Sequence, residues 1–184
     1  MSSKALLKDL VRASVEFDAA ALFWAHLRDM ASGVQPNFEL CTIAGALCEY
    51  AQTGTLVVPG VPYPDTIVLA TRLTEALFYP AIETPTPAGD PWWWTRIYGT
   101  SSLAIVLRSS VARHRLSTLD QSVPTAFLAS LASVSPGRVR QLVSTHVLAA
   151  SHVRHGGKVY TLVDGHSART WLASHGIAPS SWPC

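Results

Sequence analysis

The sequence predicts a mainly α protein in two parts: a helical bundle over residues 1–117, and a smaller unit over residues 118–184 that combines short helices with a β-hairpin. Three observations support this. Apolar side chains recur with a helical period through most of the first part. In the second part, a short break separates two helical patterns, and strand-like segments flank Gly156 and Gly157. With 48% hydrophobic and 14% charged residues, the chain can bury a substantial core.

In the first part, the apolar pattern predicts four helices, over residues 4–31, 38–52, 66–81 and 100–116. Prolines within residues 56–65 exclude a helix there and leave a brief strand or an extended loop. Residues 82–91 are the clearest expected loop, and three consecutive tryptophans follow at 92–94. We expect the tryptophan run to pack on the bundle with at least one ring exposed or in an interface, and a partner or ligand surface is the alternative. The joint between the two parts is placed at residues 117–121.

In the second part, a helix of small and apolar residues ends near Ala132, and residues 133–135 turn the chain into another helix. Ser135 is a good N-cap, because its hydroxyl can accept a hydrogen bond from a backbone N–H of the first turn. Pro136 then takes the first helical position, where its missing N–H costs nothing. The apolar side chains of the new helix share one face: Val139, Leu142 and Val143. Two helices joined in this way form a helix-turn-helix motif, whose second helix enters the major groove of DNA.

The opposite face of that second helix is rich in hydrogen-bond donors. Arg138 and Arg140 can donate to guanine O6 and N7 or to phosphates, and Gln141 can make paired bonds to adenine N6 and N7. Ser144 can reach a phosphate or a base edge. The basic tip of the hairpin, within residues 151–163, suits phosphates or the minor groove. The candidate DNA-binding residues are Ser135, Gly137, Arg138, Arg140, Gln141, Ser144, Arg154, His155 and Lys158.

A last helix is expected over residues 168–176, capped by Asp164 or Ser167. Helix, turn, helix, basic hairpin and short helix follow one another in the order of a winged helix-turn-helix. The last third of the chain resembles the excisionase-type and MerR-type domains of this class. The matching residues are Leu131, Val134, Ser135, Val139, Leu142, Leu148, Trp171 and Leu172.

Two positions depart from the pattern of these families. Ser133 stands where they usually have glycine, and Thr145-His146 replace the glycine that usually precedes Leu148. The resemblance implies sequence-specific binding to double-stranded DNA. It also implies a transcriptional regulator or a recombination-directionality factor from a bacterium or a mobile element.

The distribution of charge agrees with a nucleic-acid partner. Residues 1–107 hold 6 Lys/Arg against 10 Asp/Glu, whereas residues 108–184 hold 8 against 2. Six of the seven histidines also lie in the second range. An acidic body with a basic carboxy-terminal part predicts binding to a polyanion, although uneven solvation of two surfaces is the simpler alternative.

Other classes of function have little support in the sequence. No apolar stretch approaches the roughly 20 residues that span a bilayer, and the amino terminus lacks the apolar core of a secretory signal. Three cysteines without a CxxC pair predict neither disulfides nor a zinc site, and we expect no cofactor. Nucleophile and phosphate-loop motifs are missing, so no enzyme is predicted. The expected location is the cytoplasm, in association with the nucleoid.

The amino-terminal helices are expected to join two copies into a homodimer, because helix-turn-helix proteins commonly bind paired half-sites. A small-molecule effector held by the bundle is another interpretation. Two alternatives to a DNA-binding regulator remain open: a DNA partition or packaging protein, and a helical protein–protein adaptor that binds no DNA.

Overall fold

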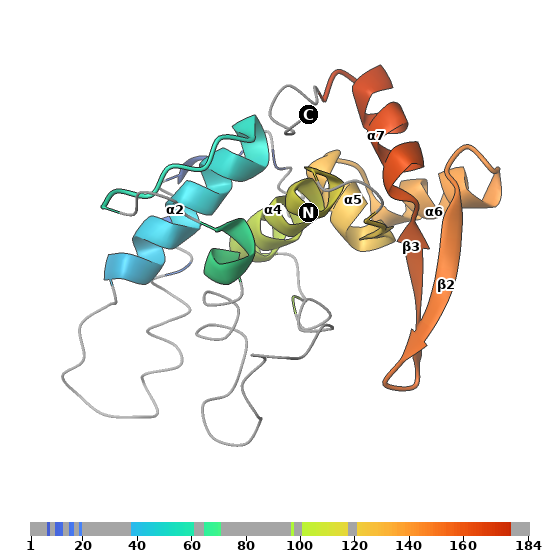
Figure 1. Ribbon diagram of the computed structural model, residues 1–184, viewed down its shortest axis with the longest axis horizontal. Coiled ribbons are helices and arrows are strands. Elements are labelled where there is room, and N and C mark those ends of the chain that lie inside the picture. The colour runs from blue at the N-terminus through green and yellow to red at the C-terminus, as the bar shows by residue number, and fades with distance from the viewer. Residues whose placement is uncertain are drawn as a thin grey trace, which may run out of the picture.

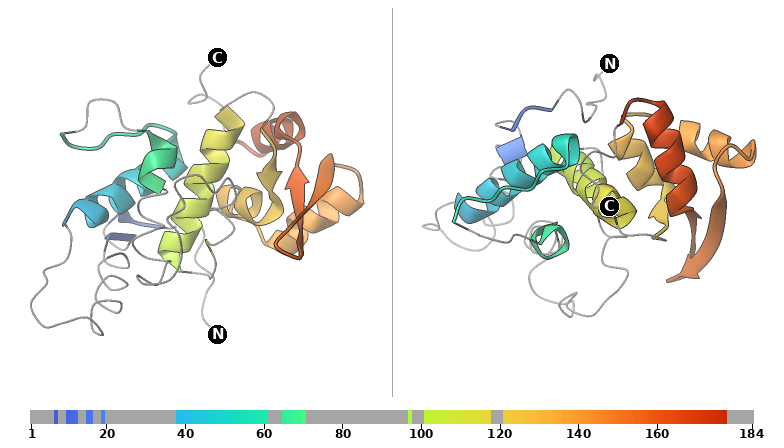
Figure 2. Two further views of the ribbon diagram at one scale, coloured as in Figure 1. Left: turned by 60° about the horizontal axis from the view of Figure 1, so that its bottom comes forward. Right: turned by 45° about the horizontal axis from the view of Figure 1, so that its top comes forward.

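The computed structural model describes residues 7, 10–12, 15, 16, 19, 38–60, 65–70, 97, 101–117 and 121–177. This part of the chain is mainly helical with one three-stranded antiparallel sheet, which confirms the mainly α fold class. The long helix α4 lies in the middle of the molecule, with α2 on one side and the carboxy-terminal helices and sheet on the other (Figures 1 and 2). No helix in the described ranges has the length and apolar content to cross a membrane.

Helix α2 (Phe38–Thr53) and helix α4 (Ser102–Ser117) form the amino-terminal part of the core. Both lie within a residue or two of the ranges expected from the apolar pattern. They pack against each other through fully buried leucines, among them Leu47 and Leu107. Residues 66–70 are helical, as expected for the start of the third helix. Within the expected first helix, residues 12, 15, 16 and 19 are helical but residues 10 and 11 are not, so a single continuous helix over 4–31 is wrong. Residues 56–60 are not helical, as expected. The expected features at residues 20–31, 71–81, 82–91 and 92–94 lie outside the described residues.

Helix α4 is also the element that joins the two parts of the chain. Its arginine side chains donate to groups on three different segments: Arg113 Nε to the Ala51 carbonyl (3.2 Å), Arg115 Nε to the Ser122 carbonyl (2.8 Å) and Arg108 Nε to Ser130 Oγ (3.1 Å). A single hydrophobic cluster runs from α2 through α4 into the carboxy-terminal helices. Most of the expected joint, residues 118–120, lies outside the described residues, so the two-domain division stays a prediction.

The carboxy-terminal elements follow the predicted order. They are α5 (Thr125–Leu131), α6 (Pro136–Ser144), β2 (Ala150–His155), β3 (Lys158–Val163) and α7 (Gly165–Ser174). Gly156 and Gly157, with φ of 54° and 75°, make the two-residue turn between the strands. The expected start of the last helix at residue 168 was three residues too late, because Asp164 caps it by accepting from Ser167 N at 2.8 Å.

One strand was not predicted. The two-residue strand β1 (Val123–Pro124) pairs with β3 and gives the sheet the order β1-β3-β2. A proline is tolerated there because β1 is an edge strand. Val123 lies opposite Val163, and both are fully buried. The strand therefore closes the sheet over the core that α5 and α7 also contact.

The predicted core of α6 is correct for two of its three residues. Val139 and Leu142 are buried together with Leu128, Leu148 and Leu172. Val143 is only half-buried and packs at the edge of the cluster, which corrects the expectation that it belongs to the core.

Candidate nucleic-acid interface

The turn between α5 and α6 has a specific hydrogen-bond pattern. Val134 N donates to the Ala129 carbonyl (3.0 Å) and Ser133 N to the Ser130 carbonyl (3.2 Å), while Ser133 adopts a left-handed φ of 54°. This is the Schellman end of a helix. The next helix begins at once, because Ser135 Oγ accepts from Arg138 N (3.1 Å). The two helices are thus connected by four residues, 132–135, one more than the sequence predicted, because α5 ends at Leu131.

Helix α6 presents a polar face on the side away from its core. The predicted site residues of the turn and this helix are all exposed: Ser135, Gly137, Arg138, Arg140, Gln141 and Ser144. On this face Arg138 Nη1 donates to Gln141 Oε1 (2.8 Å), and Ser144 Oγ donates to the main-chain carbonyl of Gln141 (2.9 Å). Gly137 leaves open surface beside them, since a Cβ at that position would meet only Ser135 Oγ, at 3.7 Å.

The end of α6 repeats the pattern seen at the end of α5. Val147 N donates to the Leu142 carbonyl (2.9 Å) and His146 N to the Val143 carbonyl (3.1 Å). His146 takes the left-handed conformation, with φ of 59°. The left-handed residue turns the chain back toward α6, and Leu148 is buried directly after the turn. The hairpin then starts beside α6 (Figure 1).

The hairpin carries the remaining predicted site residues. Arg154 and Lys158 are exposed near its tip, whereas His155 is half-buried. In Figure 1, α6 lies beside the base of the hairpin and the tip extends away from the body. A six-residue strand is about 20 Å long, so the tip lies well away from α6.

A groove of about 690 Å³ separates α6 from the two strands of the hairpin. Arg140 and Ser144 line it from the helix, His146 from the following turn, and His152 and Thr161 from the strands. His152 Nδ1 and Thr161 Oγ1 are 3.1 Å apart and share a hydrogen bond across the strands. His146 and Thr161 were not among the residues predicted from the sequence for this site. The position of Thr161 could have been predicted from the Gly156-Gly157 turn, because this turn sets the strand register that pairs Thr161 with His152.

The basic character of this end of the molecule is more local than the charge count indicated. Three of the eight Lys/Arg in residues 108–184 belong to α4, and burial lowers the pKa of each: Arg108, Arg113 and Arg115. Residues 121–177 contain five Lys/Arg against one carboxylate, Asp164. Four of these five are the exposed cations of α6 and the hairpin.

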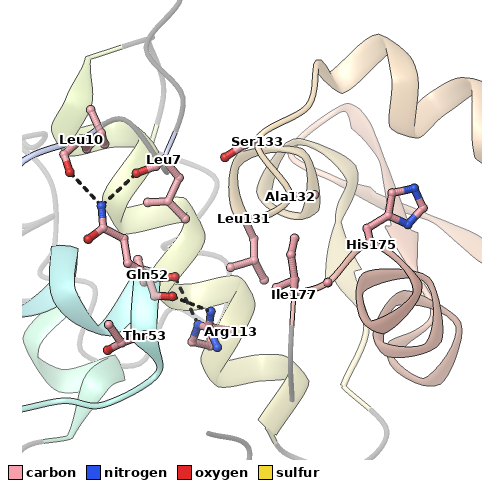
Figure 3. A pocket seen from close by; sticks show the side chains of 12 residues that line it. Leu7, Leu10, Gln52, Thr53, Arg113, Leu131, Ala132, Ser133, His175 and Ile177 are labelled. Atoms are coloured by element: carbon pink, nitrogen blue, oxygen red, sulfur yellow. Dashed lines mark hydrogen bonds between the residues drawn. The ribbon is translucent and has the colours of Figure 1, made fainter. Parts of the chain in front are cut away.

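A second cavity, of about 800 Å³, lies between the amino-terminal segments, α2, α4 and the ends of α5 and α7. Figure 3 shows two of its polar side chains, Gln52 and Arg113, bonded to main-chain carbonyls. Gln52 Nε2 donates to the carbonyls of Leu7 (3.0 Å) and Leu10 (2.8 Å), and Arg113 donates to those of Ala51 (3.2 Å) and Gln52 (3.4 Å). These bonds tie the segments together, so we assign the cavity no ligand.

The described residues contain no group of three or more His, Cys, Asp or Glu that could hold a metal ion. No protein-family model matches the chain, and searches of curated proteins and of solved structures find no match.

Proposed function

We propose that this protein binds double-stranded DNA sequence-specifically through a winged helix-turn-helix, with α5 and α6 as the two helices and the β2–β3 hairpin as the wing. The observation that carries the proposal is the exposed face of α6, which combines two arginines, a glutamine and a serine on a helix anchored by buried Val139 and Leu142. An α-helix of this kind fits the major groove, where each base pair presents a distinct set of donors and acceptors.

The charges favour a nucleic acid over a protein partner. Arg138, Arg140, Arg154 and Lys158 are exposed, and among the described residues none of them forms an ion pair. Cations without carboxylate neighbours are available to a polyanion, and they displace the counterions of DNA when they contact its phosphates. An adaptor that binds protein would gain more from an apolar patch on the same face.

Backbone conformation supports the resemblance to excisionase-type and MerR-type domains. Those families usually have glycine where this chain has Ser133 and where it has Thr145-His146. Ser133 and His146 are the two non-glycine residues with positive φ among the described residues. Glycine adopts this conformation without strain. The two positions that depart from the family pattern are thus positions where the backbone has the left-handed conformation that glycine favours.

In the proposed complex, the amino-terminal half of α6 enters the major groove and the wing contacts the adjacent backbone or minor groove. Two copies, joined through the amino-terminal helices, would bind paired half-sites. Exposed Val11, Val57 and Val68 offer apolar surface on that part of the chain. The resemblance implies a role as transcriptional regulator or recombination-directionality factor, for which we propose a cytoplasmic location, and a partition or packaging protein is the alternative among DNA-binding functions.

Fluorescence anisotropy with the full chain and a labelled duplex of random sequence tests the proposal. We expect binding at micromolar or lower concentration in low salt, because non-specific binding by such proteins has dissociation constants of roughly 10⁻⁴ to 10⁻⁶ M even at physiological salt. An adaptor would leave the anisotropy unchanged at every protein concentration, and that result would reject DNA binding. Light scattering of the same sample reports whether the chain is a dimer.

A further inference from the structure

The side chains of Arg138 and Gln141 form a pair on the exposed face of α6, with Arg138 Nη1 donating to Gln141 Oε1 at 2.8 Å. We infer that this pair recognises guanine: Arg138 contacts the base, and Gln141 is the positioning residue that directs it. The inference rests on the proposed function, since it specifies which base the α6 face selects in DNA. It also replaces the expectation that Gln141 itself pairs with adenine.

The helical geometry explains why Arg138 needs a positioning partner. At about 100° per residue, Arg138 leaves α6 at the flank of the exposed face, whereas Gly137, Gln141 and Ser144 occupy its centre. An unguided arginine side chain at the flank would sample many rotamers. The bond to Gln141, one turn further along the helix, draws the guanidinium toward the centre of the face, where a base edge would lie.

The inventory of donors and acceptors favours guanine. A bidentate contact between glutamine and adenine needs the amide oxygen to accept from N6 while the amide nitrogen donates to N7. In this structure one of the two lone pairs of that oxygen already accepts from Arg138, which turns the amide toward the arginine. Arginine has five N–H donors, so Arg138 keeps enough to donate to O6 and N7 of guanine while it holds Gln141. The pair therefore offers its donors to the base that presents two acceptors.

The other arginine of the helix is placed for a different contact. Arg140 leaves α6 on the flank opposite Arg138 and lines the groove toward the hairpin, beside Ser144 and His152. That position suits the phosphate backbone, which passes between a helix in the major groove and a wing beside it. Arg138, in contrast, lies in the first turn of α6, directly after the Ser135 cap. In helix-turn-helix proteins the amino-terminal residues of the second helix contact the bases.

The experiment is a selection of bound duplexes from a random pool by the full chain, followed by affinity measurements on the selected site with each base at each position. The variants are Arg138→Ala, Gln141→Ala, Gln141→Glu and, as a control on the wing, Arg154→Ala. Gln141→Glu keeps an acceptor for Arg138 and so tests rescue by a conservative change. A thermal melt of each variant verifies that the fold is intact.

We expect the wild-type chain to select a guanine that Arg138→Ala no longer distinguishes, with a loss of discrimination between roughly 5-fold and 100-fold at that position. Gln141→Ala should lose part of the same preference, and Gln141→Glu should retain it with lower affinity for all duplexes. Arg154→Ala should weaken binding to every sequence alike. These changes in base preference would not follow from a purely structural role of Gln141.

Two results overturn the inference. If the selected site contains an adenine whose preference disappears in Gln141→Ala but survives in Arg138→Ala, then Gln141 is the reading residue and the pair has no such role. The second such result is that Arg138→Ala and Gln141→Ala both keep the full preference for guanine. In either case the protein still binds DNA, whereas failure to retain any duplex rejects the proposed function itself.

Discussion

Ser133 and His146 hold equivalent positions at the ends of successive helices, each as the left-handed residue of a Schellman motif, with φ of 54° and 59°. The end of α7 has the same pattern, in which Ile177 N donates to the Leu172 carbonyl (3.1 Å), but there the left-handed residue is Gly176, with φ of 74°. One hydrogen-bond geometry is thus built with three different residues, two of which are strained by their Cβ atoms.

We therefore expect Ser133→Gly and His146→Gly each to raise the free energy of unfolding, by about 0.5–1 kcal/mol, because glycine removes the Cβ strain but costs some unfolded-state entropy. Gly176→Ser is the matched control and should lower stability by a similar amount. Urea denaturation of the three variants measures the effect. A loss of stability in both glycine variants would show that the serine and histidine side chains contribute more than the strain they impose.

Two glycines of the carboxy-terminal part should respond oppositely to alanine. At Gly165 a Cβ would lie 2.6 Å from the Gln121 carbonyl oxygen, a backbone atom that cannot move without disturbing the entry to β1. Gly165→Ala should cost about 1–3 kcal/mol of unfolding free energy. Gly137→Ala meets no close atom and should be neutral or slightly stabilising, by up to about 1 kcal/mol. Equal melting temperatures for the two variants would contradict the packing of α7 against the segment before β1.

Burial raises the pKa of the Cys48 thiol to about 11, and Glu49 and Glu16 add to the shift. The neutral thiol therefore persists in the folded protein, and its contribution to stability is present below the ordinary pKa of 9.0 and lost as the pH rises through about 11. At about pH 8, a thiol reagent should label Cys48 only after denaturant is added. The assay uses a Cys184→Ser variant and mass spectrometry, and rapid labelling of Cys48 in the native protein would contradict its burial.

The wing should supply affinity without sequence preference. Arg154→Ala combined with Lys158→Ala removes two exposed cations from the hairpin tip, and we expect weaker binding to every duplex and a salt slope smaller by about 2. Arg12→Gln is the control, because Arg12 pairs with Glu16 and Glu49 in the amino-terminal part of the chain. Because the control removes one charge and the wing variant removes two, a loss of affinity about half as large in the control would mean that net charge, rather than the wing, controls binding.

Much of the carboxy-terminal architecture was predictable because its signals are local. Ser135 followed by Pro136 marks a helix start, and Gly156-Gly157 marks a two-residue hairpin turn. Strand β1 was missed because two residues carry no periodicity, and the strand exists only through its pairing with β3. The start of α7 was misplaced for a related reason: Ser167, the other expected cap, instead accepts from Ala149 N at 3.0 Å.

The candidate site was predictable to the level of a helix face. The helical repeat alone places Arg138, Arg140 and Gln141 away from the core. The hydrogen bond between Arg138 and Gln141 depends on rotamers, and the groove beside Arg140 depends on how the hairpin returns to α6 after His146. Neither relationship follows from spacing along the chain, because both require the tertiary arrangement.

The dependence of DNA affinity on salt tests the central claim most directly. If Arg140, Arg154 and Lys158 contact phosphates, log K should fall against log salt with a slope of roughly −3 for each bound chain. Arg140→Ala should reduce that slope by about 1, whereas Arg138→Ala should weaken binding to the selected site with little change in slope. A wild-type affinity that does not vary with salt, or that neither substitution alters, would contradict a DNA interface on α6.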